Sequence, residues 1–511
     1  MNTRSFLIKS KENTPIIKIM EKLYSVKKET PKQVNRIYFD TFELDLQKNG
    51  LVFYKTGTNY VLHPINIENN IELTTFKSSK QLKFWQNFPT LDLKNKFKAM
   101  LGIRALIAYA ALKNEIQLCS IVDSEEKMVV RIYLENFSLE STGLFLGKVL
   151  SLKPIKGYDK YYFQLLNLFS EHDNIQSLEQ KDFIRHIVKA GNILPTKYSA
   201  KPACINEPQM SSSEAVKKLL CSLISVIKIN EDGVVKDIDT EFLHDFRVAI
   251  RRTRSILGLL KVVFNEEAIM PFKSGFASLA GSTNKLRDYD VYLLNKDKYQ
   301  LILPPHLHQG LNQFFKNIKK RKKYEHKKLV QQINSTSYNE FITSWEDYLI
   351  NASDNNMFNN INSTLPIIDQ ARKHIYSRFK KIIKKGAKIN RNSPDSELHD
   401  LRLDCKKLRY LIEFFSGLFP EKDISRLIVQ LKKLQDCLGE FNDYSIQQIH
   451  LEDYLLTVNA SASNSIELAA TIGALVTASY QEKLKRRNSF FKIFRTFSST
   501  ININLYIKLF N

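Results

Sequence analysis

The sequence predicts two domains of different fold class: an α+β domain at the N-terminus, followed by an all-α domain made of two four-helix repeats. Two patterns predict this division. Residues 1 to about 170 mix short β-rich runs, such as 36–40 and 128–134, with helical patterns such as 95–112. From about residue 211, apolar residues recur at helical spacing, as they do over 216–227.

The boundary between the two domains is predicted in a segment that contains several prolines and ends in a run of serines. This segment runs from residue 191 to residue 211 and contains Pro195, Pro202 and Pro208. Such a composition favours a linker that ends at a helix cap. We therefore expect a first domain, linker included, at residues 1–204 and a second domain at residues 205–511.

Charge limits the partners that the chain can bind. Among its 511 residues, 76 lysines and arginines outnumber 53 aspartates and glutamates, so the formal net charge is +23. Hydrophobic residues make up 43% of the chain, which is enough for packed cores and excludes a disordered basic tail. The excess of cations favours anionic partners such as nucleic acid, polyphosphate or a lipid surface.

The cysteines and the N-terminal segment bear on the cellular compartment. The five cysteines lie far apart without CxxC spacing, which argues against a disulfide framework and against a zinc site. Residues 1–15 lack the apolar core of a signal peptide, and the longest apolar stretch, 99–112, is interrupted by Arg104. We expect a cytoplasmic protein without a membrane span, a metal or a cofactor, and leave association with polyphosphate granules open.

A motif of eleven residues occurs twice in the all-α half. HDFRVAIRRTR at 244–254 returns as HDLRLDCKKLR at 399–409, at an offset of 399 − 244 = 155 residues. Segments that flank the motif, among them 214–218 and 286–289, find matches at the same offset. The shared offset predicts a duplicated structural unit.

Each copy of this unit is predicted to hold four helices. Repeat one spans about 211–335 and repeat two about 366–498. Each supplies a first helix, the motif helix, a third helix that ends near Asp288 or Asp443, and a long final helix. We expect these two aspartates to cap or orient neighbouring groups rather than to act as acids. The segment 295–305 is expected to be a loop.

The motif helix is predicted to carry its cations in one stripe. At about 100° per residue, motif positions 0, +3, +7 and +10 fall within about 80° of arc on a helix. Like charges at this spacing repel by roughly a few tenths of a kcal/mol per pair, and a chain of phosphates would offset that cost. The alternative is that both stripes are ordinary solvated helix faces. In repeat one the stripe consists of His244, Arg247, Arg251 and Arg254, and in repeat two of His399, Arg402, Lys406 and Arg409.

The repeated motif resembles the CHAD domain, the conserved histidine α-helical domain. The resemblance covers roughly residues 211–494 and implies two pseudo-symmetric four-helix bundles around a basic cavity that binds inorganic polyphosphate. It implies phosphate ligands on both motif helices and supporting cations on neighbouring helices. Repeat two departs from repeat one in using lysines at 406 and 407 and in having Asn442 where repeat one has Arg287, so the two halves are not expected to bind with equal affinity. The implied ligands are His244, Arg247, Arg251, Arg252, Arg254, His399, Arg402, Lys406, Lys407 and Arg409, with Lys217, Lys218, Arg372, Lys373 and Arg287 in support.

The N-terminal half resembles a degenerate CYTH domain, the β-barrel-like triphosphate tunnel fold. The segments that carry this resemblance are 38–41, which reads YFDT, and the basic stretch 153–161. Hydrolysis by that fold requires metal-binding glutamates in an ExExK strand, because hard cations prefer carboxylate oxygens. Here the strand reads Ser5-Phe-Leu7-Ile-Lys9, and a later strand offers Glu135 alone. We therefore expect no catalytic residues and no metal in this domain.

The resulting prediction is a protein that binds inorganic polyphosphate through its paired basic helices and is not an enzyme. The sequence contains no P-loop, GxGxxG, HExxH or GxSxG motif. Three alternatives stay open: a nucleic-acid-binding module, an inorganic triphosphatase whose metal ligands are misaligned here, and a scaffold that recognises acidic or phosphorylated proteins.

Overall fold

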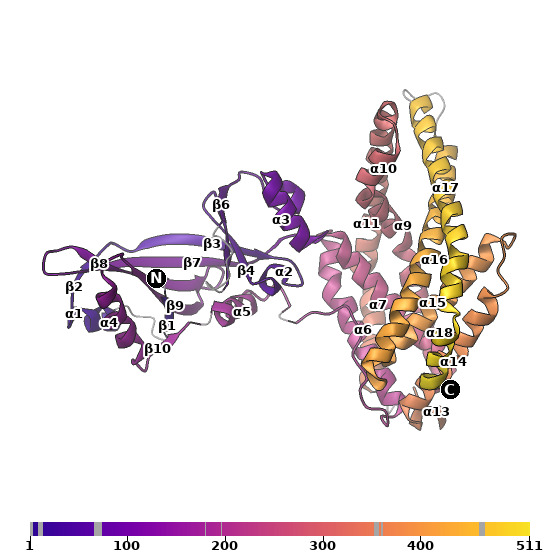
Figure 1. Cartoon of the computed structure of the whole chain (residues 1–511), viewed down its shortest axis with the longest axis horizontal. Helices are drawn as coiled ribbons and strands as arrows, with labels where there is room; N and C mark the ends of the chain where they lie inside the picture. The colour runs from indigo at the N-terminus through magenta and orange to yellow at the C-terminus, as the bar shows by residue number, and fades with distance from the viewer. Residues whose placement is uncertain are drawn as a thin grey trace. The chain divides into compact units, whose positions relative to one another are not determined.

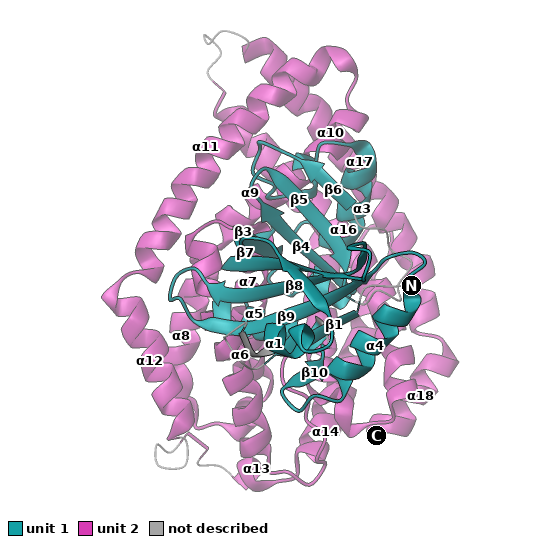
Figure 2. Cartoon of the chain, turned by 90° about the vertical axis from the view of Figure 1, so that its left-hand side faces the viewer, with its two compact units in different colours: residues 1–199 teal, residues 200–511 magenta. Residues whose placement is uncertain are grey.

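The computed structural model of the chain describes residues 4–8, 14–65, 74–178, 180–195, 197–351, 357–358, 361–458 and 465–511. The chain divides into two compact units, residues 1–199 and residues 200–511 (Figure 2). The sequence predicts a boundary slightly later, between residues 204 and 205. The predicted α+β class of the first unit and all-α class of the second are confirmed.

Unit one is built on an antiparallel sheet of ten strands (Figure 1). The strand order is β10-β1-β9-β8-β7-β3-β4-β5-β6, and β2 pairs with β7 beside this path. Every pairing between these strands is antiparallel. The strands are β1 (Arg4–Ile8), β2 (Ser25–Lys28), β3 (Lys32–Asp40), β4 (Leu51–Thr56), β5 (Asn59–Pro64), β6 (Thr74–Lys77), β7 (Ile107–Val122), β8 (Met128–Leu139), β9 (Phe145–Pro154) and β10 (Ile175–Ser177).

Helices cover both faces of this sheet. On one face, α1 (Thr14–Glu21) and α4 (Asp159–Ser170) pack over a core that includes Ile132 and Leu134 of β8. Successive side chains of a strand point to opposite faces, so Phe137 of β8 lies on the other face. There its ring meets the ring of Phe183 on α5 (Gln180–Gly191), with 5.0 Å between the ring centroids.

The helix predicted over 95–112 is wrong in its second half. The helix α3 (Leu91–Leu101) ends at Gly102, whose φ of +55° is strained for residues with a Cβ atom. From Ile107 the chain instead enters β7, which pairs with β3 on one side and with β8 on the other. Pairing on both sides of β7 outweighs the helical preference of its alanines.

Unit two contains two similar sets of helices, and the predicted duplication is confirmed. Three helices start at the same 155-residue offset: Ser212 and Ile367 for the first, Thr240 and Asp395 for the second, Glu266 and Glu421 for the third. Repeat one comprises α6 (Ser212–Val235), α7 (Thr240–Leu259), α8 (Glu266–Ser282), α9 (Asn284–Leu294), α10 (Lys296–Ile302), α11 (His308–Ile333) and α12 (Thr336–Ile350). After the short α13 (Ile361–Thr364), repeat two comprises α14 (Ile367–Gly386), α15 (Asp395–Phe415), α16 (Glu421–Leu456), α17 (Ser465–Phe497) and α18 (Thr500–Phe510).

The third helix differs between the repeats. In repeat two it is the continuous α16, whereas in repeat one the same stretch is divided among α8, α9 and α10. The first break falls at Thr283, whose hydroxyl donates to the carbonyl of Ala280; its counterpart in α16 is the buried, apolar Leu438. The loop predicted over 295–305 is wrong for the most part, because Lys296–Ile302 is helical.

Each repeat also carries a fifth helix that was not predicted. The helix α12 packs against α6 in repeat one, and α18 packs against α14 in repeat two. In the second pair, the ring of Tyr506 stacks on the ring of Phe379 with 3.7 Å between centroids. No helix within the described residues combines the length and the apolarity needed to cross a membrane.

Candidate anion-binding site

The two motif helices, α7 and α15, contact each other across the boundary between the repeats. Asp239 caps the start of α7 because its side chain accepts the backbone N–H groups of Glu241 and Phe242. Arg251 of α7 donates through Nε to the hydroxyl oxygen of Tyr410 on α15, at 2.5 Å. The apolar side of each helix is buried, which fixes the direction of its cations.

A cavity of about 330 Å³ opens between these helices and is called the cation pocket below. Six of the predicted ligands line it, three from each repeat. With five arginines and lysines against two carboxylates, its lining has a formal charge of 5 − 2 = +3 when histidine is neutral. The lining residues are His244, Val248, Arg251, Arg252, Arg402, Lys406, Arg409, Tyr410, Glu413, Gln435 and Asp436.

Burial, with a smaller contribution from neighbouring cations, lowers the pKa values of basic groups in and beside the pocket. Burial, followed by the charges of Arg402 and Arg251, lowers the pKa of Lys406 to about 8. Burial and the charge of Arg251 lower the pKa of Arg247 to about 10. Burial likewise lowers the pKa of Arg402, although Asp443 opposes that shift. An anion in the pocket would relieve this excess of positive charge.

Two of the pocket arginines are already paired with the same carboxylate, that of Glu413. Glu413 accepts from Arg252 Nη2 at 3.1 Å and from Arg409 Nε at 2.5 Å. Arg252 also donates to the backbone carbonyl of Ala200. At the 155-residue offset, the counterpart of Glu413 is Gly258, which has no side chain with which to do the same. The pocket is therefore not symmetric in charge.

Three predicted ligands lie outside the pocket in polar contacts of their own. Arg247 donates to the hydroxyl of Thr283 and to the side-chain oxygen of Asn284. Arg287 donates to the backbone carbonyl of Thr240 at 3.1 Å. The ring of His399 lies 2.6 Å from the side-chain oxygen of Asn442. The charge of Arg247 contributes to lowering the pKa of Lys406 in the pocket.

The remaining predicted ligands are not brought to the pocket. Lys217 donates to the backbone carbonyl of Ile350, at 2.9 Å. The others are exposed on the surface of their helices and do not line the cavity: Arg254, Lys407, Lys218, Arg372 and Lys373.

Sequence reasoning missed several residues of the pocket lining. Glu413 continues the stripe of α15, because it follows Arg409 by one helical turn, and the helical spacing could have identified it. Gln435 and Asp436 come from α16 and carry no local signal. Gln435 accepts from Arg409 and donates to the carbonyl of Cys405, so it links α16 to α15.

The N-terminal positions where metal ligands were sought hold other contacts. The hydroxyl of Ser5 bonds to that of Ser151 at 2.8 Å, and Leu7 lies with Phe183 against Gly147. Lys9 lies outside the described residues. Glu135 accepts from Arg36 at 2.7 Å and from Asn114 at 2.6 Å. Within the described residues, no group of three or more His, Cys, Asp and Glu side chains is placed to hold a metal ion.

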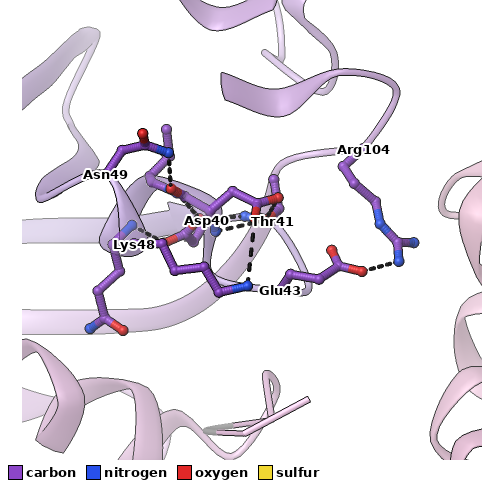
Figure 3. Close-up of polar contacts among 9 residues, drawn as sticks. Asp40, Thr41, Glu43, Lys48, Asn49 and Arg104 are labelled. Atoms are coloured by element: carbon purple, nitrogen blue, oxygen red, sulfur yellow. Dashed lines mark hydrogen bonds and ion pairs between the residues drawn. The ribbon is translucent and has the colours of Figure 1, made fainter. Parts of the chain in front are cut away.

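The aspartate of the YFDT segment organises a turn. The Asp40 carboxylate accepts the backbone N–H groups of Thr41, Leu46 and Gln47 at 2.7, 2.9 and 3.0 Å, around the start of α2 (Asp45–Lys48) (Figure 3). Burial raises its pKa to about 7, and the three donors oppose that shift. Nearby, Glu43 pairs with Arg104 (Figure 3). These carboxylates are engaged in local structure.

Comparison with known proteins gives one family and several distant structures. Residues 218–452, which include both motif helices, match the CHAD domain. The CHAD domain of the plant Ricinus communis is 20% identical, covers 58% of this chain and 95% of its own, and has a TM-score of 0.49. PptA from Streptomyces chartreusis is 12% identical, covers 56% and 100%, and has a TM-score of 0.45.

A third structure, HpAC1 from Hippeastrum, is described with a dominant triphosphatase activity. It is 11% identical, covers 39% of this chain and 99% of its own, and has a TM-score of 0.27. Each of the three TM-scores lies below 0.5, so these structures are distant from this chain. None of the curated proteins matches the chain. The helical half of this chain therefore contains a CHAD domain, at residues 218–452.

Proposed function

We propose that this protein binds inorganic polyphosphate in the cation pocket and does not hydrolyse it. One observation carries the proposal: two copies of one motif place five arginines and lysines around a single cavity of about 330 Å³. Membership of residues 218–452 in the CHAD family supports the same ligand, because that family is linked to polyphosphate.

The pocket offers its cations unequally to a phosphate chain. Arg251, Arg402 and Lys406 are the charged ligands that no carboxylate holds closely, since the nearest contact of Arg402 to Asp443 is 3.5 Å. Phosphate oxygens would accept charge-assisted hydrogen bonds from these groups, and His244 would add one ring N–H donor. Binding through several cations releases counterions, so affinity should fall steeply as salt rises.

The absence of hydrolysis is proposed from the polar groups of unit one. Ser5 and Leu7 occupy the strand positions at which metal-binding glutamates would be required. The carboxylate of Glu135, in the later strand, already accepts from Arg36 and Asn114. That of Asp40, in the YFDT segment, already accepts a backbone N–H group. Phosphate release from tripolyphosphate in the presence of magnesium or manganese would contradict this part of the proposal.

Binding is tested by calorimetric titration of long-chain polyphosphate into the full chain at about physiological salt. Alanine at Arg247, Arg251, Arg402 and Lys406 should abolish binding and leave the helical circular dichroism unchanged. The matched control removes four exposed lysines of α11, Lys316, Lys319, Lys320 and Lys323, which lie outside the pocket. Equal loss in both variants would show that net charge, rather than the pocket, determines binding.

Competition separates polyphosphate from nucleic acid as the ligand. At equal phosphate concentration, single-stranded or duplex DNA should fail to displace polyphosphate from the full chain. Displacement by DNA would favour a nucleic-acid-binding module that uses the same cations. Capture of an acidic protein without polyphosphate, lost in the pocket variant, would favour a scaffold.

A further inference from the structure

A second cavity, of about 340 Å³, lies on the boundary between the repeats and shares no lining residue with the cation pocket. We call it the seam cavity. Helices α9 and α10 of repeat one and α16 and α17 of repeat two form its walls. Residues at the 155-residue offset face it in pairs: Asp288 with Asp443, Val291 with Ile446, and Asn295 with His450. Both copies of the duplicated helix thus contribute the same face.

The charge of the seam cavity is opposite to that of the chain. Its lining holds the carboxylates of Asp288, Glu440, Asp443 and Glu482 against the single ammonium of Lys298. The formal charge is therefore −4 + 1 = −3 with histidine neutral, in a chain of net charge +23. Three of these carboxylates pair with cations outside the lining, so the charge that favours a cationic ligand over phosphate is concentrated at Asp288.

Asp288 is the least compensated of these carboxylates. Arg402 lies 3.5 Å from Asp443, Arg486 lies 3.0 Å from Glu440, and Lys485 lies 2.6 Å from Glu482. For Asp288, no hydrogen bond or ion pair joins the carboxylate to any part of the chain that the structure describes. Burial, and to a smaller degree the charge of Asp443, raise the pKa of Asp288, while His450 and Arg247 oppose that shift.

The rest of the lining is apolar and aromatic. Val291, Ile302 and Ile446 are 42%, 45% and 40% exposed, so the cavity presents aliphatic surface to its contents. The ammonium of Lys298 lies 5.2 Å from the centroid of the Tyr444 ring and donates to its hydroxyl. This contact shows that an ammonium group fits against the aromatic wall.

We propose that the seam cavity binds an aliphatic diamine or polyamine. One ammonium group would pair with Asp288 and relieve its unfavourable burial, and the methylene chain would cover Val291, Ile302 and Ile446. A second ammonium would reach the carboxylates near Asp443. A metal ion fits this lining less well, because no three ligating side chains converge among the described residues. The aliphatic side chains of the lining also have no atoms that can ligate a metal ion.

The test is calorimetric titration of 1,4-diaminobutane and of spermidine into the full chain without polyphosphate, since polyphosphate itself binds amines. We expect one site per chain for each amine. Asp288→Asn should weaken binding at least tenfold. The matched control, Glu340→Gln, removes one exposed carboxylate of α12 outside both cavities and should change nothing. The uncharged 1,4-butanediol should not bind.

A second variant covers the case in which Asp288→Asn does not fold. Val291→Lys places an ammonium in the cavity from an exposed position and should abolish amine binding. Either variant should bind polyphosphate with the affinity of the unchanged chain. Loss of the amine site can therefore be distinguished from loss of the cation pocket. Absence of amine binding at millimolar concentration, equal binding of butanediol, or unchanged binding in both variants would overturn the proposal.

Discussion

Glu413 of α15 holds Arg252 of α7 across the boundary between the two repeats, with 3.1 Å between Oε2 and Nη2. The same carboxylate accepts from Arg409 within its own helix. Both side chains of the cross-repeat pair are mostly buried, at 12% exposed for Arg252 and 19% for Glu413. An anion of the protein thus occupies part of a pocket that we propose for phosphate.

Replacing Glu413 with Gln should strengthen polyphosphate binding, because two arginines become available to phosphate. Several-fold tighter binding by calorimetry is expected. The free energy of unfolding should fall by about 1–3 kcal/mol, since buried donors lose their charged acceptor. Asp400→Asn, an equal change of charge at an exposed position of α15, is the control and should alter neither quantity. Weaker binding in Glu413→Gln would show that Glu413 positions the arginines for phosphate instead of competing with it.

The lowered pKa of Lys406, about 8, predicts that affinity depends on pH. Polyphosphate binds the protonated amine, so affinity should be steady below about pH 7 and fall as pH rises through 8.

Folding stability should instead rise with pH over this range. The unfolded chain holds this proton up to about pH 10.4, so between 8 and 10 it binds more protons than the folded chain, and stability rises with pH.

Titrations at pH 7 and pH 9 check this prediction, with Lys406→Arg as the comparison. The guanidinium keeps its charge in this range, so the affinity of the variant should be much less sensitive to pH. An equal fall in the affinity of both proteins would show that a group other than Lys406 causes the pH dependence.

The exposed pair Arg372 and Lys373 should matter less than the pocket pair Arg402 and Lys406. Alanine at both members of each pair removes two charges from one helix in either case. Because neither Arg372 nor Lys373 lines the pocket, their removal should reduce affinity only through the long-range field, which salt screens. Salt titration measures the difference. As ionic strength rises, the affinity of the Arg372 and Lys373 variant should approach that of the unchanged chain. The Arg402 and Lys406 variant should approach no binding.

A buried ion cluster in repeat two has an uncharged counterpart in repeat one. Asp404 is 3% exposed and pairs with Arg378 and Lys385, each at 2.7 Å, while Lys381 lies at 3.7 Å. At the 155-residue offset, the corresponding residues of repeat one are Ala249, Leu223, Asn230 and Val226.

Asp404→Ala alone should lower the unfolding free energy by about 1–3 kcal/mol, because three partly exposed cations lose a buried partner. Transplanting all four residues of repeat one into repeat two should recover most of that loss, which chemical denaturation would measure. A quadruple variant as unstable as Asp404→Ala would show that the surrounding core of repeat two cannot accept these uncharged side chains.

Much of the cation pocket could be predicted because side chains on one helix face have fixed directions. Once the apolar side of α15 is buried, Arg402 and Lys406 must point the same way, and the internal repeat supplies the facing helix. Gln435 could not be predicted, since its place depends on how α16 packs on α15. The helix predicted over 95–112 failed for a similar reason, because β7 is stabilised by distant strands rather than by its local sequence.

The contrast between Gly258 and Glu413 shows what a tandem arrangement permits. Two identical chains that pair about an axis must place the same residue on both sides, so an acidic group in one half would appear in the other. Here both halves belong to one polypeptide, and each position is encoded separately. One copy can acquire a competing acid while the other keeps glycine, so ligand affinity can be tuned by a substitution in a single half.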